Sequence, residues 1–432
     1  MPDRIRYAQV GLGVRSWIFS LAIAREYAEQ AELVALCDSN RGRLAHRCQW
    51  AKDVGLDAPG YAAEDFERMI AERQPDCVIV TPPDRDHAHY LCRAMELGCD
   101  VVCEKPLTID APSLQRILEV QSRTGRYCRV AFNYRYSPPR AQVKALLSSG
   151  AIGDVLSVDF HWLLDTAHGA DYFRRWHRKR ANSGGLLVHK ATHHFDLMNW
   201  WLDSVPHTVQ ASGARRFYTP ENADALGLQG RADRCLDCAR ASACAFHLDL
   251  REQKLLRLMY LDHEEHDGYH RDGCVFSPEI DIEDSMNVLV DYRNGTRMSY
   301  SLNAFMPREG YTVCFNGTRG RLDHVCEESS YVSGSSPTAA SLDAERTSIT
   351  LQGHFEKAQP VPLEAASGSH GGGDERLLAD LFSPGSSPDP LGRAADQRAG
   401  AWSVLTGIAA NESMRQGERV LVADLVSGLE LP

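Results

Sequence analysis

The sequence predicts an α/β protein that begins with a parallel sheet covered by helices on both faces and continues into a second, strand-rich domain. Short apolar runs alternate with helical patterns as far as residue 132, which is typical of parallel strands joined by helical crossovers. After residue 152 six further runs resemble strands, and Asn294-Gly295 between two of them favours a tight hairpin turn. These runs are residues 155–164, 208–217, 287–292, 297–303, 311–316 and 348–353.

Composition and charge exclude several classes of protein. A chain of 432 residues has room for two domains, and its net charge of −11 disfavours binding to nucleic acid or to an anionic membrane surface. No apolar run approaches the length of a membrane span, and the first residues lack the apolar core of a signal peptide. We therefore expect a cytoplasmic protein that binds neither nucleic acid nor membranes.

The first apolar run ends in a glycine pair that is typical of dinucleotide-binding sites. Gly11 and Gly13 follow a predicted strand and open a predicted helix, so the backbone can approach a pyrophosphate at the helix N-terminus. Ser16 stands where a third glycine is usual. Asp38 closes the next strand and can accept hydrogen bonds from ribose hydroxyls, which favours NAD over NADP, although Arg41 nearby could attract a 2′-phosphate.

Polar residues also follow three later strands of the predicted sheet, residues 77–81, 99–103 and 127–132. Ligands of parallel sheets bind beyond the carboxyl ends of the strands, so Lys105 should lie at the cofactor site instead of standing free in solvent. The residues that we expect to contact the cofactor are Gly11, Gly13, Val14, Arg15, Ser16, Asp38, Arg41, Thr81, Pro82, His87, Glu104, Lys105 and Asn133.

A segment dense in ionisable groups, residues 186–201, follows a pair of glycines. On one continuous helix His189, His193 and Asp196 would share a face, at positions i, i+4 and i+7, with Lys190 beside them. Such groups within apolar sequence favour a helix whose polar edge lines a cavity. A surface helix with satisfied histidines is the alternative.

The loop before this segment mixes aromatic rings with hydrogen-bond donors. Tyr172, Trp176 and His177, with His168 just before them, would suit a polyhydroxylated ring, because aromatic rings stack on its C–H faces while polar groups bind its hydroxyls. The loop is also rich in arginine, so it could instead bind a phosphate or carboxylate of the substrate, or form a basic surface loop.

Residues 214–276 do not continue the strand pattern and form a predicted insertion that is rich in cysteine and histidine. Two close thiols, a third nearby and a distant fourth match a tetrahedral structural zinc site of four cysteines, or of three and a histidine. Unrelated cysteines in a loop are the alternative. The predicted zinc ligands are Cys235, Cys238, Cys244 and Cys274.

Together these motifs resemble the Gfo/Idh/MocA oxidoreductases, which include glucose–fructose oxidoreductase and inositol dehydrogenases. The matching motifs are Gly11-x-Gly13, Asp38, Thr81-Pro82-Pro83 with His87, Glu104-Lys105-Pro106, and Gly184-Gly185 with His193-x-x-Asp196. The resemblance implies a Rossmann domain in residues 1–133 and a substrate and oligomerisation domain, with a large, mostly antiparallel, open-faced sheet, in residues 134–392. It also implies a C-terminal helix and tail, residues 393–432, packed back on the Rossmann domain, and homodimers or homotetramers.

The resemblance further implies a catalytic role for Lys105. The family's second catalytic motif, Asp-x-x-x-His, falls on His189 and His193, so a histidine stands where an aspartate is usual. Histidine can bind a sugar hydroxyl or relay a proton, but it carries no fixed negative charge. We expect Lys105 and His193 to act on the substrate proton, with His189 as a possible relay.

These residues predict an NAD-dependent oxidoreductase that removes a hydride from a secondary alcohol of a sugar, a glycoside or a cyclitol. The alternative is an NAD-dependent, redox-neutral glycoside hydrolase or lyase, which oxidises a ring hydroxyl transiently to allow elimination. A non-catalytic NAD-binding regulator is a third class, which the presence of both Lys105 and His193 disfavours. The residues expected to line the substrate site are Lys105, His168, Tyr172, Trp176, His177, Lys190, His193 and Asp196.

Overall fold

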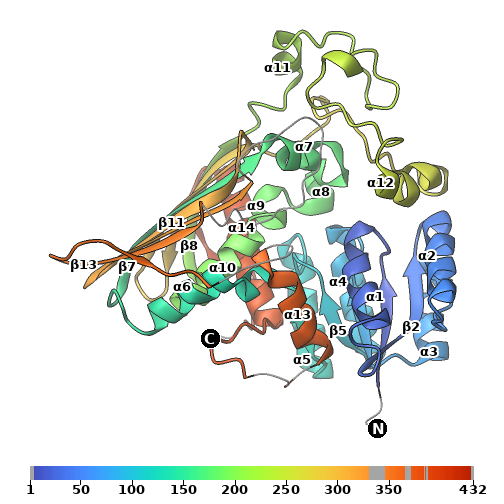
Figure 1. Ribbon diagram of the computed structural model, residues 1–432, viewed down its shortest axis with the longest axis horizontal. Helices are drawn as coiled ribbons and strands as arrows, with labels where there is room; N and C mark the ends of the chain where they lie inside the picture. The colour runs from blue at the N-terminus through green and yellow to red at the C-terminus, as the bar shows by residue number, and fades with distance from the viewer. Residues whose placement is uncertain (1–3, 330–345, 365–370, 384, 386–387, 430–432) are drawn as a thin grey trace.

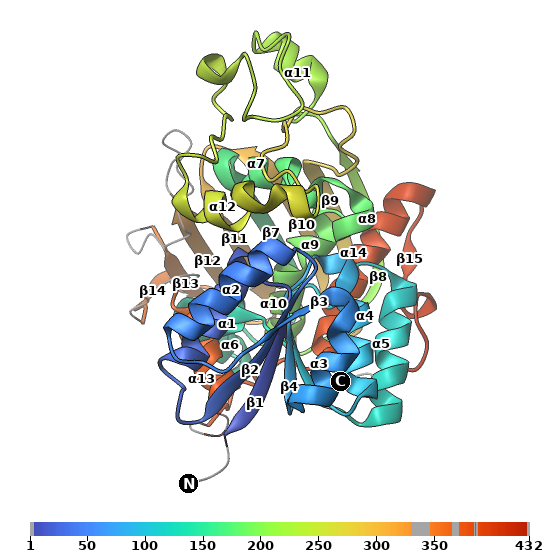
Figure 2. The ribbon, with the colours of Figure 1, turned by 90° about the vertical axis from the view of Figure 1, so that its right-hand side faces the viewer.

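The computed structural model describes residues 4–329, 346–364, 371–383, 385 and 388–429. Two sheets with their helices lie side by side, and an inserted segment rises beside them and bends over the N-terminal domain (Figure 1; Figure 2). In the described part of the chain, no helix is both long and apolar enough to cross a membrane.

The N-terminal domain is a six-stranded parallel sheet in the order β3-β2-β1-β4-β5-β6. Most strands are short, buried apolar runs, because helices cover both faces of the sheet. The predicted parallel architecture is confirmed. The strands are β1 (Ile5–Val10), β2 (Ala31–Asp38), β3 (Gly60–Ala62), β4 (Cys77–Val80), β5 (Asp100–Cys103) and β6 (Cys128–Val130), and the α-helices are α1 (Trp17–Ala24), α2 (Arg41–Asp53), α3 (Phe66–Arg73), α4 (His87–Glu96) and α5 (Ala111–Thr124).

The second domain is built on a nine-stranded sheet in the order β14-β13-β12-β11-β7-β10-β9-β8-β15. Its described strand pairs are antiparallel except for β10 with β7, so the predicted mostly antiparallel sheet is confirmed. The strands are β7 (Val155–Asp165), β8 (Pro206–Ala214), β9 (Ser285–Tyr292), β10 (Arg297–Met306), β11 (Glu309–Gly317), β12 (Gly320–Ser329), β13 (Ser348–Gly353), β14 (Gln359–Val361) and β15 (Val420–Leu421).

Several strands differ from the sequence prediction, which lacks the short strands β3, β14 and β15. The strand β12 is absent from the prediction, although it pairs with both β11 and β13. The strand β8 ends at Ala214 instead of continuing to residue 217. There the Asp284 carboxylate accepts hydrogen bonds from the backbone N–H groups of Phe217 and Tyr218, at 2.7 and 2.9 Å, which directs the chain out of the sheet.

The segment predicted as one helix forms two. Residues 190 and 191 separate α9 (Leu186–His189) from α10 (Thr192–Leu202). Both helices are buried beside α14 (Gln397–Gln416), where a Cβ on Gly407 would come within 2.3 Å of the Leu187 carbonyl oxygen. They are therefore core elements, and the surface-helix alternative is wrong.

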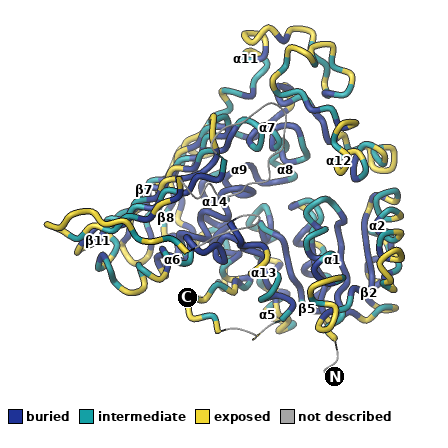
Figure 3. The backbone as a smooth tube through the Cα atoms, in the orientation of Figure 1, coloured by how far each residue is buried: buried dark blue, intermediate teal, exposed yellow. Residues whose placement is uncertain are grey.

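The insertion occupies residues 215–284, between β8 and β9. It has little core of its own, because Cys235, Leu248 and Leu250 form a small cluster apart from the two main cores. Its outer turns are largely exposed (Figure 3), whereas α12 (Lys254–Met259) and the 3-10 helix η7 (Leu261–His266) lie over the N-terminal domain next to α2 (Figure 1).

Two C-terminal helices connect the domains. The helix α13 (Gly373–Phe382) packs on the N-terminal domain, where the rings of Phe382 and Tyr7 meet edge to face at 5.1 Å between centroids. The helix α14 contacts α5 and β6 of the N-terminal domain as well as α10 and β8 of the second. The C-terminal helix therefore packs on both domains, and not on the first alone.

Candidate functional site

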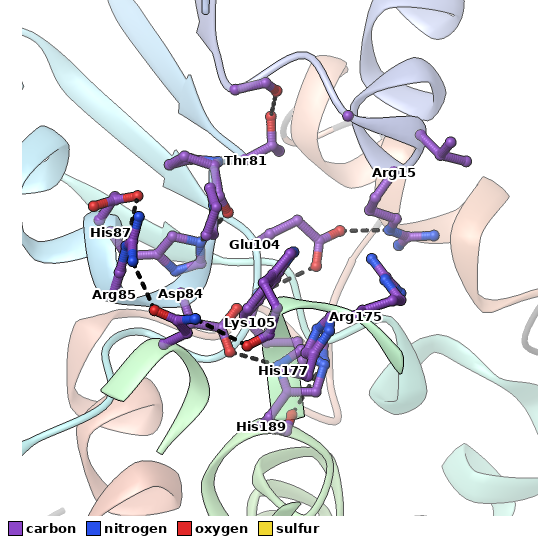
Figure 4. Close-up of a pocket in the computed structure, with 18 of the residues that line it drawn as sticks. Arg15, Thr81, Asp84, Arg85, His87, Glu104, Lys105, Arg175, His177 and His189 are labelled. Carbon is purple, nitrogen blue, oxygen red and sulfur yellow. Dashed lines mark hydrogen bonds and ion pairs between the residues drawn. The ribbon is translucent and has the colours of Figure 1, made fainter. Parts of the chain in front are cut away.

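A cavity of about 780 Å³ lies at the carboxyl ends of β1, β4 and β5, where both domains and the insertion meet. This is the edge of a parallel sheet at which ligands bind. Figure 4 shows side chains of both domains converging there. The predicted site residues that line the cavity are Gly11, Gly13, Val14, Arg15, Asp38, Thr81, Pro82, His87, Glu104, Lys105, Asn133, His168, Tyr172, Trp176, His177, His189, Lys190 and His193.

The dinucleotide end of the cavity is shaped by the glycine loop. Gly11 has a φ of +82°, and a Cβ there would lie 2.2 Å from the nitrogen of Pro82, so only glycine fits. The N–H of Leu12 donates to Asp38 at 2.6 Å, which fixes the carboxylate beside the loop. Arg43 also binds Asp38, at 3.0 and 3.2 Å, so a carboxylate and a guanidinium both lie where the adenosine ribose of a dinucleotide would bind.

Two residues expected to contact the cofactor do not line the cavity. Arg41 is exposed and pairs with Glu64 at 3.2 Å. Asn40 caps α2, so Arg41 occupies the first turn and Arg43 is the arginine that reaches Asp38. Ser16 is buried beneath the loop, where its hydroxyl accepts a hydrogen bond from Arg47 at 2.6 Å.

Lys105 is the basic group at the centre of the cavity. It follows β5, its peptide bond to Pro106 is cis, and its ammonium Nζ lies 3.3 Å from Nε2 and 3.1 Å from the carbonyl oxygen of His189 (Figure 4). Burial, with Lys190 and Arg15 in support, lowers the pKa of Lys105 to about 8 despite the opposing charges of Asp84 and Glu104. A neutral amine is therefore accessible near neutral pH.

His189 links Lys105 to an aspartate of the other domain. Its Nδ1 lies 2.5 Å from a carboxylate oxygen of Asp84, which follows β4. Burial and the charge of Lys105 hold the pKa of His189 well below its usual value, so the ring is neutral and donates from Nδ1 to Asp84. Asp84 thus places a carboxyl group beside His189, the position at which the family motif Asp-x-x-x-His has an aspartate.

Other polar groups brace this arrangement. Glu104 accepts from Arg15 at 2.6 Å, and Arg15 also binds Asp374 of α13 at 2.9 Å. His87 lies between two carbonyl groups, with Nδ1 2.7 Å from the oxygen of Pro106 and Nε2 3.1 Å from that of Pro82. Burial lowers the pKa of His87, and the neutral ring can donate a hydrogen bond to only one of these two carbonyl oxygens.

The substrate end of the cavity is lined by aromatic rings and imidazoles. The rings of Trp176 and His177 stack at 3.5 Å between centroids, and His177 meets His189 edge to face at 4.2 Å. The hydroxyl of Tyr172 lies 3.0 Å from Nε2 of His168, whose Nδ1 lies 2.9 Å from the buried carboxylate of Glu309. Burial holds the pKa of His177 far below its usual value, so His177 can donate and accept hydrogen bonds as a neutral ring.

The three residues of the predicted helix face, His189, His193 and Asp196, do not all face the cavity. His193 lines the cavity and stacks on Tyr134 at 4.3 Å between centroids, while His189 is the histidine that contacts Lys105. Asp196 does not line the cavity: it accepts from Arg135 at 2.6 and 2.8 Å, with both side chains buried. The prediction of a shared face assumed one continuous helix. Because the helix is broken between α9 and α10, the spacing i, i+4, i+7 no longer places the three side chains on one face.

Several lining residues are absent from the sequence prediction. Asp84 has a visible signal, because it closely follows a strand of the parallel sheet, as the predicted binding residues do. Residues of the insertion had no such signal, since nothing in the sequence shows where the insertion folds. The missed lining residues include Arg43, Asp84, Tyr134, Arg175, Tyr260, Asp267 and Tyr269.

The four cysteines of the predicted zinc site do come together. Cys235, Cys238, Cys244 and Cys274 line one small cavity in the insertion, with His247 beside them. Within the described residues, however, no group of three or more histidine, cysteine, aspartate or glutamate side chains is arranged to hold a metal ion. Zinc binding stays a prediction.

Comparison with known proteins identifies the family. Residues 5–132 match the family model described as the oxidoreductase family, NAD-binding Rossmann fold, and residues 144–422 match that of the oxidoreductase family, C-terminal alpha/beta domain. The chain belongs to the Gfo/Idh/MocA oxidoreductase family. The N-terminal domain is therefore the NAD(P)-binding Rossmann domain of an oxidoreductase, and the resemblance in the sequence motifs is confirmed.

The names of the similar proteins range from a general oxidoreductase to an inositol dehydrogenase. The chain is 35% identical to YteT of Bacillus subtilis, whose name says only that it is an oxidoreductase, over 92% of this chain and 93% of YteT. It is 27% identical to an inositol 2-dehydrogenase of Rhizobium meliloti over 49% of this chain and 58% of that enzyme. The crystal structure of an oxidoreductase domain protein from Kribbella flavida has the same fold, with a TM-score of 0.66 at 16% identity over 97% of this chain and 99% of that one.

The buried ion pair gives a prediction for stability. Replacing Asp196 with asparagine leaves the Arg135 charge buried without its partner, so the free energy of unfolding should fall by about 3 kcal/mol. The matched Glu412→Gln change, in a more exposed pair with Arg415, should cost less than about 1 kcal/mol. Urea denaturation measures both, and equal losses would contradict the structural role given to Asp196.

Proposed function

We propose that the protein transfers a hydride from a secondary alcohol of a sugar, a glycoside or a cyclitol to NAD. The observation that carries this proposal is the Lys105 amine, held against His189, which in turn binds Asp84, inside the cavity that the glycine loop also lines. Removing a hydride from an alcohol carbon requires removal of the hydroxyl proton, and a buried amine with a pKa of about 8 is suited to accept it.

The residues around Lys105 orient the amine that accepts this proton. The bond from Nδ1 of His189 to Asp84 fixes the tautomer whose Nε2 carries a lone pair, and this atom lies 3.3 Å from Nζ of Lys105. A proton accepted by Lys105 stays on the amine, because the pKa of His189 is held well below that of Lys105, and the ammonium group can donate a hydrogen bond to Nε2. Asp84 acts as a positioning residue, because it touches His189 and orients that ring.

The cofactor fits the other end of the cavity. The backbone N–H groups of the loop at Gly11 and Gly13 and the start of the following helix are suited to a diphosphate, and Asp38 to ribose hydroxyls. The nicotinamide ring supplies the hydride acceptor when the cofactor is bound. Asp38 favours NAD, whereas the guanidinium of Arg43 beside it could bind the 2′-phosphate of NADP. The preference for NAD over NADP is therefore part of the proposal.

The substrate end of the cavity supports the proposed alcohol class. Trp176 offers an aromatic face, while the neutral ring of His177 and the hydroxyl of Tyr172 offer hydrogen bonds in both directions. A ring that carries several hydroxyl groups matches this combination better than a simple aliphatic alcohol. The named inositol dehydrogenase among the relatives agrees with a cyclitol or sugar.

A second candidate function is redox-neutral cleavage of a glycoside with transient oxidation. His177, His189 and His193 line one cavity, which provides more acid and base groups than removal of a single proton requires. Elimination of an aglycone followed by addition of water needs such additional proton transfers.

A turnover screen should separate these functions. Purified protein is mixed with NAD or NADP and with free sugars, cyclitols or chromogenic glycosides, and reduced cofactor and released aglycone are followed together. Accumulating NADH with one substrate class supports the dehydrogenase, and NAD-dependent aglycone release without net NADH supports the alternative.

Lys105→Met should lower kcat by about a hundredfold or more and leave NAD binding nearly unchanged. Lys179→Met, at a lysine outside the cavity, is the control, and equal rates in both variants would remove Lys105 from the mechanism.

We also propose that the chain forms homodimers or homotetramers through the open face of the nine-stranded sheet. In Figure 1 the α-helices α6 (Pro138–Ser148), α10 and α14 gather on one side of this sheet, and Leu289 of β9 is exposed.

A cytoplasmic location is likewise proposed, since a reducing compartment keeps thiols such as the buried Cys326 in the free state.

A structural zinc ion in the insertion is a further part of the proposal. Four thiols around one cavity, in a segment whose own apolar cluster contains only three buried residues, favour a metal that holds the segment together. Such a site would have four protein ligands and no role in the chemistry.

Elemental analysis of the purified protein tests the zinc site. We expect about one zinc per chain, lost in a Cys235→Ser, Cys238→Ser variant and retained in Cys314→Ser, a cysteine of β11 outside the insertion. Folded wild-type protein without bound metal would contradict the proposal.

A further inference from the structure

The insertion reaches across the cofactor end of the cavity and contacts the N-terminal domain at several points. The hydroxyl of Tyr260 accepts a hydrogen bond from the backbone N–H of Val14 at 3.3 Å. The amide of Asn40 donates to the carbonyl oxygen of His263 at 2.9 Å, and Arg43 lies 3.5 Å from Asp267. These contacts connect residues 259–269, which we name the clamp segment, to the glycine loop and to the start of α2.

The clamp segment approaches α2 very closely. A Cβ on Gly42 would lie 2.5 Å from Nδ1 of His263 and 2.5 Å from Cδ2 of His266, so a side chain at this position would displace both imidazole rings. Gly42 itself lies outside the cavity lining. Its lack of a side chain is what lets the clamp segment pack against α2.

The clamp segment also forms part of the cofactor end of the cavity. Tyr260, Asp267 and Tyr269 line the cavity together with Gly13 and Asp38. Arg43 connects the cofactor site to the clamp segment, because its guanidinium binds Asp38 and lies 5.8 Å above the Tyr260 ring. A dinucleotide bound along the glycine loop would therefore be covered by this segment.

The other end of the clamp segment is anchored in the second domain. Arg271, two residues after the segment, binds Asp171 of α7 (Thr166–Arg174) at 2.8 Å and lies 5.9 Å from the Tyr260 ring centre. Arg174 donates to the carbonyl oxygen of Phe246 at 3.0 Å. The insertion is thus fixed to the second domain and contacts the first, and Figure 2 shows α12 above α2 of the N-terminal domain.

We propose that the clamp segment holds the bound dinucleotide in place, that Tyr260 is a cofactor-binding residue, and that the cofactor leaves only after this segment separates from α2. Tyr260 lies on the N–H of Val14, and N–H groups of a glycine loop point toward the diphosphate of a bound dinucleotide. Its hydroxyl can donate to a diphosphate oxygen from the same place. The inference rests on the proposed use of a dinucleotide and not on the identity of the alcohol.

Dissociation of NADH, followed by stopped-flow fluorescence without any alcohol, tests this inference. Gly42→Leu inserts a side chain where His263 and His266 pack, so NADH should dissociate about tenfold faster or more. The variant should stay folded, because leucine has a higher helix propensity than glycine. Ala45→Leu, at an exposed position of the same helix, is the matched control and should release NADH at the wild-type rate.

The variant Tyr260→Phe isolates the hydroxyl group. Loss of a hydrogen bond to a charged oxygen should raise the Kd for NADH about tenfold. Equal NADH release by wild type, Gly42→Leu and Ala45→Leu would overturn the clamp, and an unchanged Kd in Tyr260→Phe would overturn the role of Tyr260. A wild-type protein that binds neither NADH nor NADPH would instead contradict the proposed function itself.

Discussion

The amine of Lys105 is held in a cavity that disfavours its charge, and much of the surrounding structure serves to keep it there. Lys105 and Asp84 come from loops of the N-terminal domain, while His189, which lies between them, comes from the second domain. The contact therefore joins the two domains at the point where the chemistry is proposed to occur. Burial lowers the pKa of the amine, and the neighbouring carboxylates limit that shift. The balance leaves a group that can gain and lose a proton near neutral pH.

The surrounding elements explain why this arrangement is rigid. Arg15 ties Glu104, next to Lys105, to Asp374 of α13, so a helix from late in the chain supports the first domain. On the opposite side, Gly407 of α14 lies against the backbone of α9, which presents His189. The catalytic groups thus sit on elements that are packed from both ends of the sequence, which limits their movement.

Local patterns made the fold and the cofactor loop predictable from the sequence. Parallel strands, the glycine pair and the acid at Asp38 depend on short-range spacing, and each lies where it was expected. Long-range pairings were not accessible in this way. Asp84 meets His189 across 105 residues, and the break after α9 turns Asp196 away from the cavity to Arg135. Arg41 was predicted at the site, but Arg43 occupies it. The cap at Asn40 fixes where α2 begins, and this start turns Arg43 toward Asp38. The insertion gave no signal at all for its place beside the glycine loop.

The most direct test of the account is the pKa of Lys105 itself. Competitive acetylation of lysine amines with acetic anhydride over a pH series, resolved by mass spectrometry, gives the titration midpoint of this one side chain without a substrate. We expect a midpoint of about 8 in the wild type and a lower midpoint in Asp84→Asn, because the Asp84 charge stabilises the ammonium form. A midpoint close to the ordinary lysine value of about 10.4, unchanged in Asp84→Asn, would contradict the proposed role of Lys105 and its partners.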